Sequence, residues 1–583
     1  MSLIRELMGS AAYKKIEQDV SVFVEEKLSG YKPQRIESKT IHDSIWGSVD
    51  YSAWEMQIID SPLFQRLRDL SQTGLAMFTY PTARHSRFEH SLGVATVAKK
   101  ICARIPLNCD ENIPGASKNC IILAALLHDI GHCFYSHLSE TIYGELEDFR
   151  ELRKQFSNKL ELNPKPHEIL SFIIINCAAF KEFFFYKVDY PEKSSSYVQN
   201  NLLLEAGQAI IGDKIKRNEK SYSYITAIIN GPFDADKLDY IKRDSITAGL
   251  ALEYDLERLF AKISIHETFE NGIFEKRLMI NYNGVTAIEE LTFCKIMLFS
   301  YIYYHHKVLV SEAMIRDYIY GLCELGIINS FADFLKYTDS DILGLAQQQK
   351  DYNPFPSAGA FLDLKKLTFN IRNRVFPKRC FEMGHFNIEP LDFQHEKTAF
   401  KSKAAFEYFD RCKRIIDEIK STDSYDLETF SQEIQLLSTM EERIDKPPPL
   451  NLQIKELQDL DYGGLLVKRK DFYDMLVAAY KEAGLAVSFN LFDIYLIFPK
   501  EVNYGTTVDA VVLCRDKVNT MTINDFIKLD DWAAAFNSNK WRGYVFVSDK
   551  IDRTIAYKVA EKFVLKGKAK LKNPTAYIKG LQL

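Results

Sequence analysis

The sequence lacks the features that would place it in several large classes of protein. Its 10 cysteines include no Cys-x-x-Cys pair, which is typical of reduced, mostly buried thiols rather than of a disulfide framework. No apolar run reaches membrane-spanning length, and the segment Met1 to Glu6 is not followed by the apolar stretch of a signal peptide. The net charge is only −5, which argues against broad non-specific binding of nucleic acid but leaves a local basic groove open. We therefore expect a cytoplasmic protein that does not span a membrane.

The length of 583 residues is too great for a single core and predicts several domains. The stiff run Pro447-Pro448-Pro449 is the clearest boundary, and segment 398–445 before it is predicted to be helical. The expected division is an N-terminal helical extension at 1–45, a nearly all-helical core at 46–335, a helical extension at 336–446 and a C-terminal α/β element at 447–583. The predicted fold class is mainly α, with a smaller C-terminal α/β or α+β element.

The C-terminal element is predicted from β-branched and aromatic runs that alternate with helical stretches. The expected strands are 486–492, 494–498, 508–513 and 543–548, and the expected helices are 531–536 and 554–565.

A histidine and an aspartate follow an unusually apolar segment of the predicted core. Ile121 to Leu127 is apolar on every face, which indicates a buried helix that carries His128 and Asp129 into the interior at its C-terminal end. A buried, charged Asp is costly unless it is paired or bound to a metal. By itself a His-Asp pair usually means an ion pair or a helix cap. The other motifs of the sequence therefore determine whether His128 and Asp129 are metal ligands.

The rest of the pattern adds one more imidazole upstream and a second carboxylate downstream. His90 opens another apolar, helix-like segment, and Asp236, Tyr240 and Asp244 lie four residues apart, so that they can share one face of a helix. Imidazole and carboxylate ligands together suit a divalent transition metal, which can activate water at neutral pH. The sequence therefore predicts a metal-dependent phosphohydrolase.

The stretch from about residue 40 to 310 resembles the HD-domain superfamily and, within it, the deoxynucleoside triphosphate triphosphohydrolases. Other HD branches, such as cyclic-dinucleotide phosphodiesterases and HD nucleases, commonly carry Lys where this chain has His132. The matching motifs are Ser61-Pro62-Leu63-Phe64-Gln65-Arg66-Leu67-Arg68, Arg87-Phe88-Glu89-His90-Ser91-Leu92-Gly93-Val94, His128-Asp129-Ile130-Gly131-His132 with Ser136-His137, His167-Glu168, and Asp234-Ala235-Asp236-Lys237-Leu238-Asp239-Tyr240 with Arg243-Asp244.

The resemblance implies a role for each matching side chain. The metal would be held by His90, His128, Asp129 and Asp236, and its identity is open among Mn, Fe, Zn, Ni and Co, with Mg possible beside the triphosphate. His132, His137 and His167 would surround the α-phosphate and orient water or protonate the leaving group. The implied substrate-binding residues are Gln72 and Asp244 at the sugar 3′-hydroxyl, Arg87, Lys237 and Tyr240 at the triphosphate, and Tyr304 against the nucleotide. The implied reaction releases a deoxynucleoside and inorganic triphosphate from a dNTP.

The resemblance also implies regulation and assembly. Relatives form homo-oligomers (dimers, tetramers or hexamers) and respond to a nucleotide at an interface, where Arg68 and Lys307 match loosely. The chain departs from the family pattern by having Lys295 and Ser300 where an Arg and a His are expected. Either Lys295 holds the phosphate tail or the substrate sits differently. Two alternatives stay open: an HD phosphodiesterase or nuclease, and a module that senses nucleotides without turnover. The activity would fit nucleotide-pool control or antiviral defence equally well.

Overall fold

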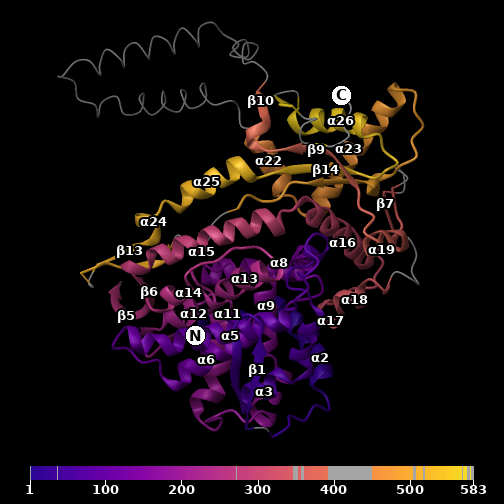
Figure 1. The fold of residues 1–583 in the computed structure, drawn as a ribbon. Helices are drawn as coiled ribbons and strands as arrows, with labels where there is room; N and C mark the ends of the chain where they lie inside the picture. Colours follow the sequence, from indigo (N-terminus) through magenta and orange to yellow (C-terminus); the bar gives the residue numbers. More distant parts are fainter. Residues whose placement is uncertain are drawn as a thin grey trace, which may run out of the picture. The chain divides into compact units, whose positions relative to one another are not determined.

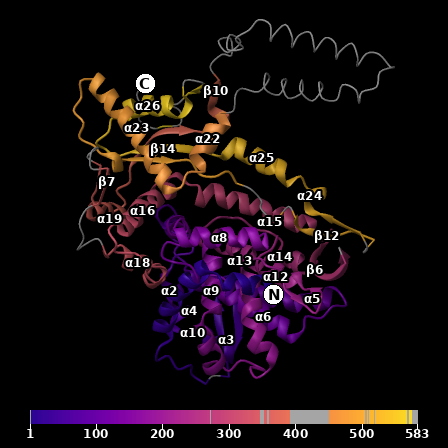
Figure 2. The same ribbon diagram turned by 180° about the vertical axis from the view of Figure 1, so that it is seen from behind.

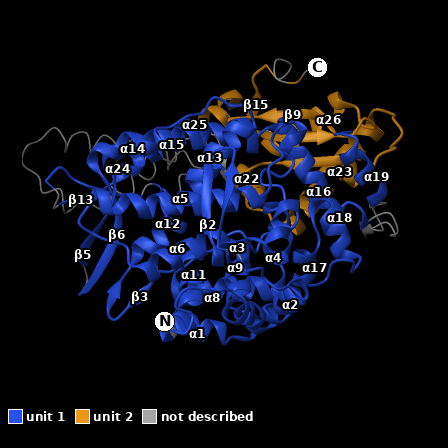
Figure 3. Ribbon diagram, turned by 60° about the horizontal axis from the view of Figure 1, so that its bottom comes forward, with its two compact units in different colours: residues 1–376, 501–537 blue, residues 377–500, 538–583 orange. Residues whose placement is uncertain are grey.

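The computed structural model describes two compact units, which are coloured separately in Figure 3. The first contains residues 1–376 and 501–537, and the second contains residues 377–500 and 538–583. The described residues are 2–35, 37–270, 272–345, 352–355, 360–390, 450–502, 507, 509–516, 519–566, 569–573 and 578. The predicted helix at 398–445 and the boundary at Pro447 to Pro449 lie outside them, so the four-segment division stays a prediction.

The first unit is mainly α, which confirms the predicted fold class. Figures 1 and 2 show α6, α9, α12 and α13 lying close to one another in both views. Its helices of five residues or more outside the π-helical turns are α1 (Ser2–Met8), α2 (Ala11–Leu28), α3 (Ala53–Ile59), α5 (Arg87–Asn108), α6 (Gly115–Leu127), α7 (His137–Tyr143), α8 (Glu147–Leu160), α9 (Pro166–Asn176), α10 (Ala178–Glu182), α11 (Leu203–Ile210), α12 (Ser223–Ile229), α13 (Ala235–Thr247), α14 (Leu256–Phe260), α15 (Val285–Leu298), α16 (His306–Glu324), α17 (Phe331–Lys336), α19 (Leu364–Arg372) and most of α25 (Leu529–Lys540).

Helix α6 is the central helix of this unit. As its composition predicts, none of the side chains from Ile121 to Leu127 is more than 4% exposed. The helix packs against α5, α11 and α12, and α5 packs in turn against α13. The ends of these packed helices therefore meet at fixed positions, and His128 follows directly after α6.

The expectation of a nearly all-helical core up to residue 335 is wrong. β1 (Ser38–Asp43) and β2 (Gly47–Ser52) form a hairpin, and β5 (Ile263–Glu270) pairs antiparallel with β6 (Ile273–Asn281). A larger sheet has the order β13-β12-β6-β4-β3, with β5 also on β6. Its other strands are β3 (Lys216–Arg217), β4 (Lys220–Ser221), β12 (Val511–Leu513) and β13 (Thr520–Thr522). The apolar alternation that signals a strand is weak here, because charged residues such as Glu267, Glu275 and Lys276 interrupt it.

The second unit is a smaller element of mixed helices and strands, and its residues overlap only in part with the predicted 447–583, since residues 501–537 belong to the first unit. Its antiparallel sheet has the order β11-β14-β9, and a short pair joins β10 to β15. The elements are β9 (Lys378–Met383), β10 (Ile388–Pro390), α22 (Leu450–Gln458), α23 (Tyr462–Glu482), β11 (Ile494–Ile497), β14 (Gly543–Val547), α26 (Arg553–Leu565) and β15 (Ala569–Leu571). Side chains such as Phe381, Phe472 and Val545 form its core.

Most elements predicted after residue 485 are present, with one exception. The strands expected at 494–498, 508–513 and 543–548 correspond to β11, β12 and β14, and the two helices to α25 (Leu529–Lys540) and α26. Residues 486–492 form no strand. Residues 486–488 are exposed, and Asn490 caps a short 3-10 turn by accepting a hydrogen bond from the Phe492 amide at 2.8 Å. A segment that has no neighbouring strand forms no ladder of hydrogen bonds in an extended conformation. The cap at Asn490 therefore determines the local backbone conformation.

Within the described ranges, no single helix has both the length and the apolar character needed to cross a membrane. α9 and the segment Ala178–Lys187 meet that test only as a pair, and they are bent by 52°.

Candidate active site

Four predicted metal ligands meet where α5, α6 and α13 come together. His90 lies in the first turn of α5, His128 and Asp129 follow α6, and Asp236 lies in the first turn of α13. The Nε2 atom of His90 is 3.4 Å from the Nε2 atom of His128 and 3.0 Å from an oxygen of Asp236. An oxygen of Asp129 is 3.3 Å from His128 Nε2. Ligand bonds of about 2.0–2.2 Å place neighbouring donor atoms roughly 3.0–3.5 Å apart, so these side chains fit one metal ion.

The outer nitrogen of each imidazole fixes which nitrogen faces the site. His128 Nδ1 lies 2.8 Å from the carbonyl oxygen of Ala125, which can only accept, so Nδ1 carries the proton. His90 Nδ1 lies 2.8 Å from a carboxylate oxygen of Asp239. The Nε2 atoms are therefore the ones that face the site, and a cation bound between them would displace any proton on His90 Nε2 and accept a lone pair from each ring.

The contact behind His90 depends on a glycine. Asp239 also accepts hydrogen bonds from the Arg243 guanidinium at 2.7 and 2.9 Å. A Cβ atom on Gly93 would lie 1.9 Å from Asp239 Oδ1 and 2.4 Å from Arg243. Only glycine at this position lets α13 approach α5 closely enough for Asp239 to orient His90.

The carboxylates of this site require positive charge. Burial alone would lower the pKa of His90, but its hydrogen bonds to Asp236 and Asp239 raise that pKa to about 10. Burial would raise the pKa of Asp129, but His128 and Arg87 outweigh it and hold that pKa well below its ordinary value. Arg87 is itself buried and donates to Asp129 at 2.7 Å. A divalent cation can supply the charge that the acidic side chains require.

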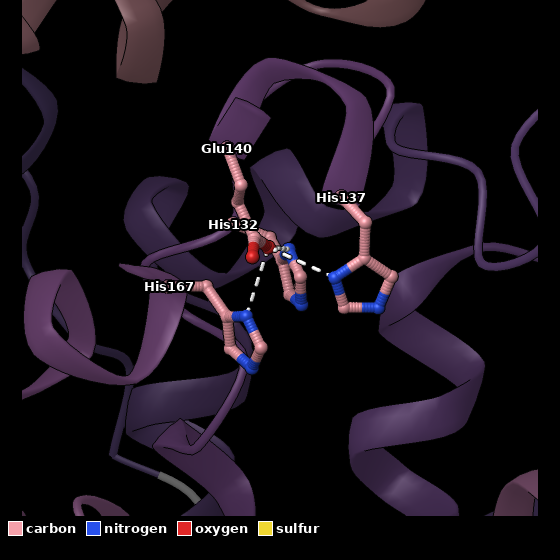
Figure 4. A group of neighbouring side chains, drawn as sticks. All are labelled: His132, His137, Glu140 and His167. Carbon is pink, nitrogen blue, oxygen red and sulfur yellow. Dashed lines mark hydrogen bonds and ion pairs between the residues drawn. The ribbon is translucent and has the colours of Figure 1, made fainter. Parts of the chain in front are cut away.

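Three more imidazoles gather around one buried carboxylate, Glu140 (Figure 4). A single oxygen of Glu140 lies 2.9 Å from His167 Nδ1, 3.0 Å from His137 Nδ1 and 3.3 Å from His132 Nδ1. The rings of His132 and His167 stack with their centroids 3.9 Å apart. Glu140 lies one helical turn after His137 on α7, and sequence reasoning did not find it.

Glu140 gives the stacked pair different protonation behaviour. Burial lowers the pKa of His167, but the hydrogen bond and charge of Glu140 outweigh it, so the pKa is raised. Burial, with the positive charges of Arg87 and His167, lowers the pKa of His132 to about 3. His167 is therefore the proton carrier of the pair, and His132 is neutral near pH 7.

These groups open onto one cavity of about 550 Å³. His90 and His128 lie behind the cavity wall: His90 contacts Asp236 and His128 contacts Asp129, and both of these aspartates line the cavity. The predicted residues that line it are Gln72, Arg87, Asp129, His132, His137, His167, Asp236, Tyr240, Asp244 and Tyr304. Lys237 is not among the lining residues, because its ammonium donates to Gly231 O at 2.8 Å and to Asp234 at 2.5 Å. Arg68 and Lys307 also lie outside the cavity wall; the Arg68 guanidinium is 3.5 Å from the centre of the Phe88 ring.

The wall near Asp244 is rich in hydrogen-bonding groups. One oxygen of Asp244 is 2.8 Å from His85 Nε2, and the other accepts from the Tyr303 hydroxyl at 2.5 Å. The buried Oε1 atom of Gln72 has no hydrogen-bond partner among the described residues. A buried polar atom without a partner is costly, so Gln72 is set to receive a donor from a bound molecule.

A group of lysines lies near Asp236. Lys165 lines the cavity, and the half-buried Lys295 of α15 is close enough to Lys237 and Lys165 for their charges to act on it. Burial, with the charge of Lys237, lowers the pKa of Lys295 to about 8. The sequence pattern had singled out Lys295 and Lys237 but not Lys165.

Comparison with known proteins places part of the site, including His90, His128 and Asp129, inside a recognised domain. The model of the HD domain matches residues 87–182, and that of the HD associated region matches residues 255–358. An uncharacterised protein of Methanocaldococcus jannaschii is 32% identical over 282 residues, which are 48% of this chain and 48% of that protein. The deoxynucleoside triphosphate triphosphohydrolase SAMHD1 homolog of Dictyostelium discoideum is 31% identical over 233 residues, 39% of this chain and 40% of that protein. The matches thus span half or less of these relatives.

A solved structure shares the fold. The phosphohydrolase from Bacteroides thetaiotaomicron superposes with a TM-score of 0.51 at 16% identity, over 88% of this chain and 100% of that one. At this identity the likeness concerns the fold alone.

Proposed function

Because the chain belongs to the HD-domain family of dNTPase-like proteins, we propose that it is a metal-dependent deoxynucleoside triphosphate triphosphohydrolase. In this reaction the oxygen of water bonds to the α-phosphorus of a dNTP, and the bond from that phosphorus to the 5′-oxygen breaks. The 5′-oxygen leaves with a proton as part of the deoxynucleoside, and inorganic triphosphate is the other product.

The observation that carries the proposal is the meeting of three kinds of group in one cavity. Metal-type donors lie at one side, cationic donors from Arg87 and Lys165 flank them, and Gln72 and Asp244 supply hydrogen-bonding groups further along. A phosphodiesterase needs the first two kinds but not the third. The relative named as a dNTP triphosphohydrolase, 31% identical over part of the chain, supports the same choice.

His90, His128, Asp129 and Asp236 would hold the metal. When bound, a divalent metal supplies Lewis-acid chemistry: it neutralises phosphoryl charge and lowers the pKa of water. Arg87 is positioned for the phosphoryl oxygens by its contacts with Asp129 at 2.7 Å and with Ser136 Oγ at 3.0 Å. A guanidinium held in this way presents its remaining N–H groups in a fixed direction.

His167 is the residue best placed to protonate the leaving 5′-oxygen. Its Nδ1 faces Glu140, and its Nε2 lies 4.0 Å from Asp129, on the side of the metal donors. The pKa of His167 is raised by Glu140, which makes this ring a better proton carrier than His132. Neutral His132, stacked beside it, adds no second positive charge to compete for that proton.

The lowered pKa of Lys295 predicts how the activity changes with pH. Its pKa of about 8 means that the ammonium is charged at pH 7 and loses its charge as the pH rises through 8. If Lys295 contacts the phosphate tail, kcat/KM for a dNTP falls as the pH rises from 7 to 9. Lys295→Met should lower kcat/KM at pH 7 by about 10-fold, the strength of one charge-assisted hydrogen bond, and should remove that descending limb. A wild-type profile that is flat between pH 7 and 9 would contradict this role.

The proposed activity is tested by incubating the full-length protein with each dNTP, singly and mixed, under Mn²⁺. The expected products are deoxynucleoside and inorganic triphosphate; the chelated protein should release neither, and addition of Mn²⁺ should restore both. Monophosphate products, or cleavage of a cyclic nucleotide or nucleic acid in place of dNTPs, would replace the proposal with the phosphodiesterase or nuclease alternative. Metal-dependent nucleotide binding without any product would instead leave a sensing module.

The same experiment addresses regulation and assembly. We propose a homo-oligomer with a nucleotide-responsive site near Arg68 and Lys307, which lie outside the cavity wall. Faster turnover of a dNTP in the mixture than alone, lost on Arg68→Ala, would support that site. Equal rates alone and mixed would argue against it.

A further inference from the structure

One face of α16 forms the wall of the cavity beyond the hydrogen-bonding groups at Asp244. Leu309, Glu312 and Arg316 follow one another at spacings of three and four residues, so they share one side of the helix, and all three line the cavity. The helix starts just after Tyr303, whose hydroxyl contacts Asp244, and Tyr304, which also lines the cavity. The wall therefore runs from Asp244 through the tyrosines to Glu312 and Arg316.

The Glu312 side chain faces this space opposite a glycine. A Cβ atom on Gly74 would lie 3.7 Å from Glu312 Oε1, and Gly74 has a φ of +55°, a backbone conformation that favours glycine. The Glu312 carboxylate makes no hydrogen bond to any described residue. Burial raises the pKa of Glu312 to about 7, although the charge of Arg316 opposes the rise. The carboxylate is thus largely desolvated, and no hydrogen bond from a described residue replaces the lost water.

The proposed function fixes which part of a substrate would reach this wall. With the phosphates at Arg87 and the metal donors and the sugar at Gln72 and Asp244, the base extends along Tyr304 toward α16. We infer that Glu312 reads the base and that the substrate preferred by this chain is a guanine nucleotide, an inference that rests on the proposed triphosphohydrolase function.

Guanine follows from the hydrogen-bonding pattern of the wall. A base with two neighbouring N–H donors favours the ionised form of the Glu312 carboxylate, because that form accepts at both oxygens. Guanine presents such a pair, N1–H and the 2-amino group, whereas the other three DNA bases do not. Arg316, one turn further along α16, offers N–H donors of the kind that suits the O6 acceptor of guanine.

The inference is tested by measuring kcat/KM for dGTP, dATP and dITP with wild-type protein and Glu312→Gln. The base of dITP lacks the 2-amino group, so it removes one of the two donors and nothing else. The expected wild-type preference for dGTP over dATP is about 10- to 100-fold, the range for one bidentate contact, with dITP in between. Glu312→Gln should reduce the dGTP-to-dATP ratio by at least about 10-fold. The matched control is Glu324→Gln, an exposed residue of the same helix, which should leave the ratio unchanged.

Two results would overturn the inference. One is wild-type protein that hydrolyses dGTP, dITP and dATP equally, and the other is a Glu312→Gln variant that slows all three alike. If wild-type protein hydrolyses no dNTP, the proposed function fails, and equilibrium binding of dGTP and dATP to the Mn²⁺-loaded protein decides this inference separately. Tighter binding of dGTP that Glu312→Gln abolishes supports base reading, and equal binding refutes it.

Discussion

Replacing His128 by alanine is expected to lower the turnover of dNTPs by at least about 10³-fold, because the metal loses one of its donors while the remaining charges stay buried. His128 Nε2 lies 3.4 Å from His90 Nε2 and 3.3 Å from Asp129, so its removal leaves those two side chains facing an incomplete site. The negative charges of Asp129, Asp236 and Asp239 still act on His90, which favours a proton there in place of the metal.

Two measurements separate this effect from general damage. Metal content, measured on the purified variant, should fall together with triphosphate release. His42→Ala removes an exposed histidine of β1 and should change neither quantity. A His128→Ala protein that keeps its metal and remains within about 10-fold of wild-type turnover would show that this cluster is not the reaction centre.

Replacing Gly131 by alanine should destabilise the first unit by about 2–4 kcal/mol, since the new methyl group has no free space. A Cβ at this position would lie 2.4 Å from both the carbonyl oxygen of His167 and the amide nitrogen of Ser171. Backbone atoms cannot turn aside as a side chain can, so α9 must shift. The Ser171 hydroxyl, which accepts from the Gly131 amide at 2.9 Å and donates to the His128 carbonyl at 2.6 Å, would shift with it.

Chemical unfolding followed by tryptophan fluorescence measures this loss. Because α9 carries His167, turnover should also fall by about 100-fold, as a displacement of about 1 Å at a reacting group produces. Gly115→Ala is the matched control: a Cβ at Gly115 would meet no atom within 4 Å, and the residue starts α6. A Gly131→Ala protein as stable as Gly115→Ala would show that the contact between Gly131 and α9 is not tight.

The sequence predicted the inner part of the site because its signals are local. The apolar segment before His128 and the four-residue spacing of Asp236, Tyr240 and Asp244 both follow from helix geometry, and the structure brings these residues together. The supporting residues gave no such signal. Glu140 and Asp239 are acidic residues on helices, which usually face solvent, and only the packing of α7 against its neighbours or of α13 against α5 makes them partners of histidines.

The parts of the fold that were predicted wrongly also depend on contacts that leave no local signal in the sequence. β5 and β6 depend on pairing with each other and with β12, which lies more than 200 residues further along the chain. Segment 486–492 has the composition of a strand but no neighbouring strand to pair with. Lys237 matched a phosphate-binding pattern, yet the caps of α13 draw its ammonium to Asp234. In each case a contact between distant segments, or a cap, outweighs the local preference.

During synthesis, β12 emerges from the ribosome long after β6, the strand with which it pairs. Val512 and Leu513 pair with Ile280 and Asn281 at the end of β6, so this edge has no partner until the ribosome has added more than 200 further residues. At typical rates of synthesis that interval lasts about 10–50 s. During it the nascent chain exposes unpaired backbone N–H and C=O groups, the kind of edge on which aggregation begins. Expression yield should therefore depend on chaperones that bind the chain before residue 513 emerges, and shortened chains that stop before β12 should be poorly soluble.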